Sequence, residues 1–225
     1  MSAGIDRLDS LKPNERARWL AVWEIVSVLV SCLIAEWVVL AFVGRSKLIM
    51  AVPIILALAL MIVSHRERGE SLRDIGFRVD NFLPALRLIV LPTVAAIVVI
   101  IVIAFLANTT IHVAPWRNRF FALPLWALFQ QYALNGFINR RAELVLGRGR
   151  GSVLLVGLCF GLVHLPNPWL TVLTMVGGLI WAAAYQRQQN LFALALSHAL
   201  VSLTLALVVP QSLLHSLRVG FKYFG

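Results

Sequence analysis

Charge is scarce in this sequence. Only 13% of its 225 residues are charged, while 60% are hydrophobic and the mean hydropathy is +0.85. Soluble domains carry nearer a quarter charged residues, so the composition excludes that class and indicates a polytopic membrane protein. A chain of this length holds one bundle of about six to eight spans, each of roughly 20 residues.

Cysteine is also scarce, and a signal-peptide pattern is missing. Cys32 and Cys159 both fall inside apolar runs, so we expect buried thiols rather than a disulfide. Residues 1–18 are polar, and the apolar run after them is too long for a signal-peptide core, so no cleavable leader is predicted. No residue pattern points to a cofactor.

The apolar runs predict an all-α bundle of about seven transmembrane spans, or eight if the C-terminal tail re-enters the membrane. The expected organisation is a polar lead at 1–18, a bundle at 19–209 and an amphipathic tail at 210–225. A short amphipathic helix is expected from Ser71. The expected spans are residues 19–43, 48–63, 83–106, 120–139, 148–165, 169–185 and 191–209.

The basic excess gives a formal net charge of +10. The basic residues flank apolar spans in short loops, so topology and anionic lipid explain them, and we expect no nucleic-acid partner. With a cytoplasmic N-terminus, 14 of the 20 Lys and Arg residues fall inside and 6 outside, which favours that orientation. The expected location is the bacterial inner membrane.

Polar side chains interrupt the span that begins near Phe120. Gln130, Gln131 and Asn135 lie in a hydrophobic helix, where unpaired amides cost kcal/mol apiece. Their candidate partners are His164 and His198 in later spans. Buried polar groups on three spans indicate a functional cavity.

The order and spacing of these residues resemble the CPBP family of intramembrane endopeptidases, also called Abi or CAAX-protease-like. That family reads Glu-Glu-x-x-x-Arg-Gly, then Phe-x-x-x-His, then His-x-x-x-Asn. The matching stretches here, within about residues 120–204, are Gln130-Gln131-Tyr-Ala-Leu-Asn135-Gly136, Phe160-Gly-Leu-Val-His164 and His198-Ala-Leu-Val-Ser202.

The resemblance implies a role for each matched residue. In the family the first Glu, helped by the first His, activates water, and the other polar residues hold an oxyanion. Gln130 takes the base position, Gln131 stands beside it, and Asn135 replaces the Arg. The two histidine positions fall on His164 and His198, and Ser202 replaces the Asn. An amide cannot accept a proton from water at neutral pH, and losing a general base costs about 10²–10⁴ in rate.

Three substitutes for the missing base are open. Either histidine can serve, since an unperturbed imidazole titrates at about pH 6.5. Glu36 in the first span is another candidate, although it can instead pair with a neighbouring helix or reach the outer interface. A metal held by the two histidines would lack the usual third ligand, so no metal is predicted.

Other features have simpler interpretations. Gly157 and Gly161 form a GxxxG pattern, and with Gly177-Gly178 they indicate close helix packing. Arg140-Arg141 is interpreted as a cytoplasmic anchor of its span, with capture of a substrate carboxylate as the alternative.

Three functions are consistent with these residues. The first is an intramembrane peptidase, a hydrolase acting on a membrane-embedded or lipidated peptide or protein. The second is a pseudoenzyme that binds or protects such a partner, as in bacteriocin immunity or protein sorting. The third is a small transporter or lipid-binding bundle, although the span prolines show no pairing in matching halves.

Overall fold

The computed structural model describes residues 13–42, 47–109, 119–210 and 213–225, and within these ranges the secondary structure is helical with no strand. The all-α prediction is confirmed. The polar lead predicted at 1–18 is described only from Pro13, where the first helix begins. The helices are α2 (Pro13–Leu33), η1 (Ile34–Val39), α3 (Leu40–Phe42), α4 (Lys47–Glu67), α5 (Leu72–Ile75), α6 (Phe82–Leu106), α7 (Arg119–Gln131), η3 (Tyr132–Asn139), α8 (Arg140–Leu146), α9 (Arg150–Leu162), α10 (Pro168–Arg187), α11 (Leu191–Val208), η4 (His215–Leu217) and η5 (Gly220–Phe224).

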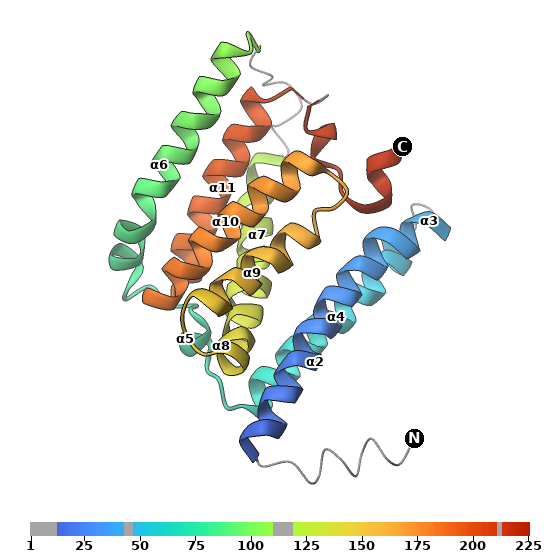
Figure 1. Cartoon of the computed structure of the whole chain (residues 1–225), viewed down its shortest axis with the longest axis vertical. Helices are drawn as coiled ribbons and strands as arrows, with labels where there is room; N and C mark the ends of the chain where they lie inside the picture. The colour runs from blue at the N-terminus through green and yellow to red at the C-terminus, as the bar shows by residue number, and fades with distance from the viewer. Residues whose placement is uncertain (1–12, 43–46, 110–118, 211–212) are drawn as a thin grey trace.

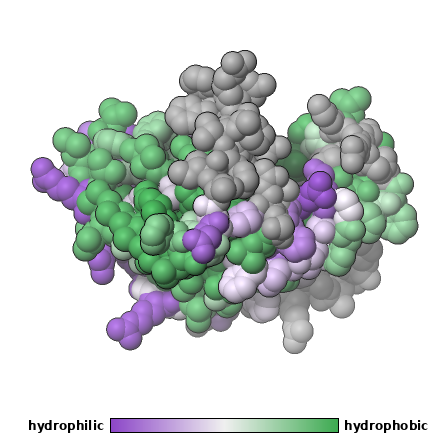
Figure 2. Space-filling view, turned by 90° about the horizontal axis from the view of Figure 1, so that it is seen from above, coloured by the Kyte–Doolittle hydropathy of each residue, from purple (hydrophilic) through white to green (hydrophobic). Residues whose placement is uncertain are grey.

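Four stretches in the described ranges are long and apolar enough to cross a membrane: 14–42, 82–106, 168–187 and 191–208. Apolar residues also cover much of the coloured surface seen from above (Figure 2). The molecule is therefore an integral membrane protein. The other three expected spans correspond to α4, to α7 with η3, and to α9, which is apolar but shorter. The count of seven stays a prediction.

The helices form two groups joined by one continuous run. α2 and α4 lie side by side, while α6, α11, α10 and α9 form the other group (Figure 1). The run α7–η3–α8 packs against α11 at its start and against α2 at its end. η3 is a π-helix, a rare form that is frequent at functional sites.

Glycines bring α9 and α10 into close contact. A Cβ added at Gly178 would lie 3.1 Å from the Cα of Gly157, and one added at Gly157 would lie 2.6 Å from the Leu179 side chain. Side chains here would force the helices apart. The packing interpretation of the GxxxG pattern is confirmed.

The C-terminal tail forms the short 3₁₀ helices η4 and η5 in its described part rather than an eighth span. The Gly220 N–H donates to the Leu165 carbonyl at 2.8 Å, beside the connection from α9 to α10. Gly220 has a φ of +57°, and an added Cβ would lie 2.6 Å from the Glu36 carbonyl oxygen. Only glycine fits this approach to the first helix.

Candidate functional site

The centre of the candidate site is a contact between α7 and α11. Gln131 ends α7 and is fully buried, and its Nε2 lies 3.3 Å from Nδ1 of His198 on α11. The Asn135 amide nitrogen donates to Gln131 Oε1 at 2.6 Å. The expectation that the buried amides need polar partners is met for Gln131 and Asn135, which bond to each other, and Gln131 also contacts a histidine.

The two histidines contact the same phenyl ring. Phe160 lies edge-on to His164 and to His198, with ring centroids 4.8 Å and 5.8 Å away. Trp181 from α10 stacks on the His198 imidazole, with the ring centroids 4.4 Å apart. Residues from α7, α9, α10 and α11 therefore converge on one buried centre.

The proton on His164 is fixed by the backbone. Its Nδ1 lies 2.6 Å from the Phe160 carbonyl oxygen, one turn earlier on α9. A carbonyl oxygen only accepts hydrogen bonds, so Nδ1 must carry the proton. Nε2 is then the unprotonated ring nitrogen and makes no side-chain hydrogen bond to the part of the protein that the structure describes.

The polar chain extends beyond the residues expected from the sequence. Asn139 Nδ2 donates to Asn135 Oδ1 at 3.0 Å, and Gln186 Nε2 donates to Asn139 Oδ1 at 3.0 Å. We call Gln131, Asn135, Asn139 and Gln186 the amide ladder. The i, i+4 spacing of residues 131, 135 and 139 is visible in the sequence and indicates that Asn139 shares a helix face with the other two amides. Gln186, one residue beyond the span expected at 169–185, is buried in the last turn of α10.

Three candidates make no hydrogen bond to this centre within the described ranges. Gln130 and Ser202 are half-buried and make no side-chain hydrogen bond within the described ranges. Glu36 lies in η1, against Gly220 of the tail, and η1 packs on α2, α3, α4 and η5. No hydrogen bond joins Glu36 to His164 or His198 in the described ranges.

Ligands for a metal do not gather at the centre. Among the residues that the structure describes, no three His, Cys, Asp or Glu side chains are placed to share an ion. The polar groups around the histidines are amides, which are weak ligands for zinc.

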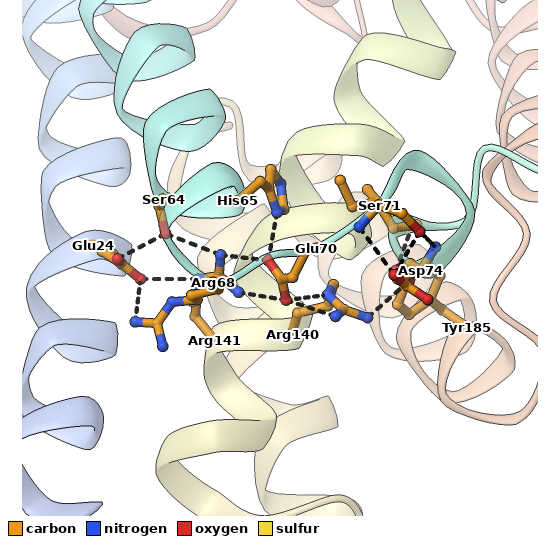
Figure 3. A network of polar contacts seen from close by, with 11 residues as sticks. Glu24, Ser64, His65, Arg68, Glu70, Ser71, Asp74, Arg140, Arg141 and Tyr185 are labelled. Atoms are coloured by element: carbon orange, nitrogen blue, oxygen red, sulfur yellow. Dashed lines mark hydrogen bonds and ion pairs between the residues drawn. The ribbon is translucent and has the colours of Figure 1, made fainter. Parts of the chain in front are cut away.

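A second buried polar region, charged rather than neutral, lies where α2, α4 and α8 meet (Figure 3). Arg141 is fully buried, and its guanidinium contacts Glu24 at 2.9 Å and Glu70 at 2.8 Å. Ser64 donates to Glu24 at 2.7 Å. The ion cluster, as we call it, consists of Glu24, Ser64, His65, Arg68, Glu70, Arg140 and Arg141.

The ion cluster adds to the interpretation of Arg140-Arg141 as a cytoplasmic anchor, because both side chains are paired within the protein. Arg141 holds two carboxylates and lies 4.8 Å over the Phe137 ring, so it is a core residue. Arg140 binds Glu70 at 2.6 Å. Burial raises the Glu70 pKa, but hydrogen bonds from His65, Arg141 and Arg140 outweigh it and hold that pKa well below its ordinary value.

Comparison with known proteins supports the predicted resemblance. Residues 119–204 match the family model described as "Type II CAAX prenyl endopeptidase Rce1-like". Neither the curated proteins nor the solved structures contain a significant match to the chain. The matched segment runs from α7 into α11 and contains Gln131, Asn135, His164 and His198. The resemblance to the CAAX-protease-like family of membrane endopeptidases is confirmed over residues 119–204.

Proposed function

We propose that this protein is an intramembrane endopeptidase in which His164 is the general base. The observation that carries the proposal is the bond from His164 Nδ1 to the Phe160 carbonyl, which leaves Nε2 unprotonated on a ring that contacts Phe160, as the His198 ring also does. The family match supports peptide hydrolysis as the reaction class. Gln130 and Gln131 cannot accept a proton from water, so one of the histidines must do so.

The reaction follows the ordinary course of peptide hydrolysis. His164 Nε2 accepts a proton from water as the oxygen bonds to the scissile carbonyl carbon. The C–N bond of the resulting tetrahedral intermediate then breaks, and His164 returns the proton to the leaving amine. The polar groups of the centre hold the negative charge that develops on the carbonyl oxygen.

The substrate class follows from where the centre lies. His198 lies on the apolar helix α11 and His164 in the turn directly after the apolar helix α9, so the scissile bond must reach them from within the bilayer or from its surface. We propose a membrane-embedded or lipidated peptide or protein as substrate. The basic loops would face the cytoplasm of a bacterial cell and bind anionic lipid in its inner membrane, with the N-terminus inside.

The test is cleavage of a peptide library by the purified protein in liposomes. His164→Ala is expected to lower the rate by about 10²–10⁴, the usual contribution of a general base. His215→Ala is the matched control, because His215 is exposed in the C-terminal tail and contacts Tyr223. Glu36→Gln should also retain activity. Equal rates for wild type and His164→Ala would refute the assignment of the base.

A second candidate function is a binding module without catalysis, and the neutrality of the centre favours it. No described carboxylate contacts His164 or His198, so the centre lacks the acidic groups of the family pattern. The same liposome assay separates the two functions. Peptide retained but never cut by the wild type supports the binding module and contradicts the peptidase.

A further inference from the structure

The hydrogen bonds of the amide ladder all run in one direction. Each amide nitrogen donates to the oxygen of the next member: Gln186 to Asn139, Asn139 to Asn135, and Asn135 to Gln131. The last nitrogen, Nε2 of Gln131, faces Nδ1 of His198. Every member is buried, so water cannot readily replace these partners.

Backbone groups fix this direction at two points. The Gly149 N–H donates to Gln186 Oε1 at 3.1 Å, and an N–H can only donate, so the oxygen of Gln186 must lie there. Asn139 Nδ2 donates to the Ala182 carbonyl at 3.2 Å, and a carbonyl can only accept. Rotating either amide by 180° would bring two donors or two acceptors together.

A side-chain contact gives the same orientation. The Ser152 hydroxyl donates to the Gly149 carbonyl at 3.0 Å, so its oxygen is free to accept. Gln186 Nε2 donates to that oxygen at 2.9 Å. The orientation of Gln186 therefore rests on Gly149 and Ser152 together, and that of the whole ladder follows from it step by step.

From this order we infer that the amide ladder is a positioning device that places the proton of His198 on Nε2. Gln131 presents a donor to Nδ1, so Nδ1 must accept and the ring proton must lie on Nε2. His164 carries its proton on Nδ1, so the two histidines hold opposite tautomers. One ring offers a lone pair on Nε2, and the other offers a hydrogen-bond donor there.

The ladder also explains why the acidic and basic residues of the family pattern are absent together. An amide donates through its nitrogen and accepts through its oxygen, so successive amides extend a one-way ladder without charge. A carboxylate at 131 would accept from both Asn135 and His198 and would draw the proton to Nδ1. Within the proposed function, His198 Nε2–H is the donor that meets negative charge on the substrate carbonyl oxygen.

The test reads the tautomer directly, by ¹⁵N NMR of histidine-labelled protein in detergent micelles at alkaline pH. In the wild type, Nδ1 of His198 is expected to be unprotonated. In Gln131→Glu it should carry a proton. Asn135→Asp, which does not touch His198, should give the same change, because Gln131 then turns its nitrogen to the new carboxylate and its oxygen to His198.

The matched control is Asn190→Asp. Asn190 is a buried amide that caps α11 through the Ala193 N–H and lies outside the ladder. The change from amide to carboxylate there should leave the His198 signals as in the wild type. A wild-type Nδ1 that carries the proton, or an Asn135→Asp spectrum identical to wild type, overturns the inference.

The inference rests on the proposed function only for its effect on catalysis. Loss of the Nε2–H donor in Gln131→Glu should lower kcat by about 10²-fold, as for removal of one oxyanion donor, with KM little changed. If the wild type cuts no peptide but the tautomers are as expected, the proposed function fails and the ladder stands. If cleavage occurs with Nδ1 protonated, the ladder fails alone.

Discussion

The ion cluster and the amide ladder are both buried and polar, yet they are built from opposite chemistry. The cluster joins two carboxylates to three arginines where the connection after α4 meets α8, and partly exposed members such as Arg68 and Arg140 reach solvent. The ladder lies among apolar helices and contains only neutral groups. Buried charges are stable where each ion is paired and some members reach solvent. Between apolar helices, neutral polar groups that hydrogen-bond to one another avoid the cost of desolvating a charge.

The two regions also act on different parts of the molecule. Glu24 on α2 and Glu70 after α4 are held by Arg141 on α8, so the cluster fixes the α2–α4 pair to the remaining helices. The ladder connects η3 to α10 and α11 beside the histidines. We therefore expect damage to the cluster to affect stability first, and damage to the ladder to affect the chemistry of His198 first.

The largest expected effect comes from Arg141→Leu. Removing this cation leaves Glu24 and Glu70 buried without their shared partner, which should lower the free energy of unfolding by about 3–5 kcal/mol. Denaturant unfolding in micelles, followed by circular dichroism, measures it. Arg73→Leu is the control, since Arg73 pairs with Asp80 at the surface and its loss should matter little. Equal stability of the two variants would show that the cluster does not hold the helices together.

Next in size is the effect of placing a carboxylate in the neutral region, by Gln130→Glu. Gln130 is half-buried, so a carboxylate there is only partly desolvated. If position 130 is the base position of the family pattern, the new carboxylate should raise the cleavage rate by about 10²-fold, the lower end of a general-base contribution. The liposome assay measures the gain. A rate that does not rise would mean that residue 130 does not face the scissile bond.

Breaking the ladder at its middle should cost less than breaking the cluster. Asn139→Leu leaves Asn135 Oδ1 and the Ala182 carbonyl without their donor, and we expect a loss of about 1–3 kcal/mol of unfolding free energy. The same unfolding experiment applies. A loss as large as that of Arg141→Leu would show that the neutral network is as important to stability as the charged one.

The smallest effect is a difference in pH dependence. The Glu70 pKa is lowered on folding, so its contribution to stability is fully present above the unfolded-state pKa of about 4.3 and is lost as the pH falls through the folded value. Unfolding free energy should decline below about pH 4.3, by at most about 1.4 kcal/mol per pH unit for one proton. Glu70→Gln should remove this share of the decline. Asn139→Leu should leave it in place, because amides do not titrate.

Much of the site could be read from spacing alone. Residues four apart lie on one helix face, so spacing pairs Phe160 with His164 and Gln131 with Asn135. His198 joins both pairs in one buried centre. The same rule extends to Asn139, four residues after Asn135. Gln186 and Ser152 could not be found this way, because their bonds join α9, α10 and η3 across long separations in sequence.

The charged residues show where such reasoning fails. Arg140-Arg141 follows an apolar run, as a membrane anchor does, and nothing in the local pattern marks one of the two as a core residue. Arg141 became one because α2 and the connection after α4 place Glu24 and Glu70 against it. Glu36 packs in η1 against Gly220 of the tail, and no hydrogen bond joins it to either histidine in the described ranges.

Hydropathy and helical spacing are local properties, so the helical class, the membrane setting, the family resemblance and the two histidines can be predicted from the sequence. Which arginine is buried, which glutamine meets a histidine and which ring nitrogen carries a proton depend on how the helices pack. Those outcomes depend on hydrogen bonds between helices far apart in the chain. The direction of such bonds is set by backbone groups that a sequence pattern does not place.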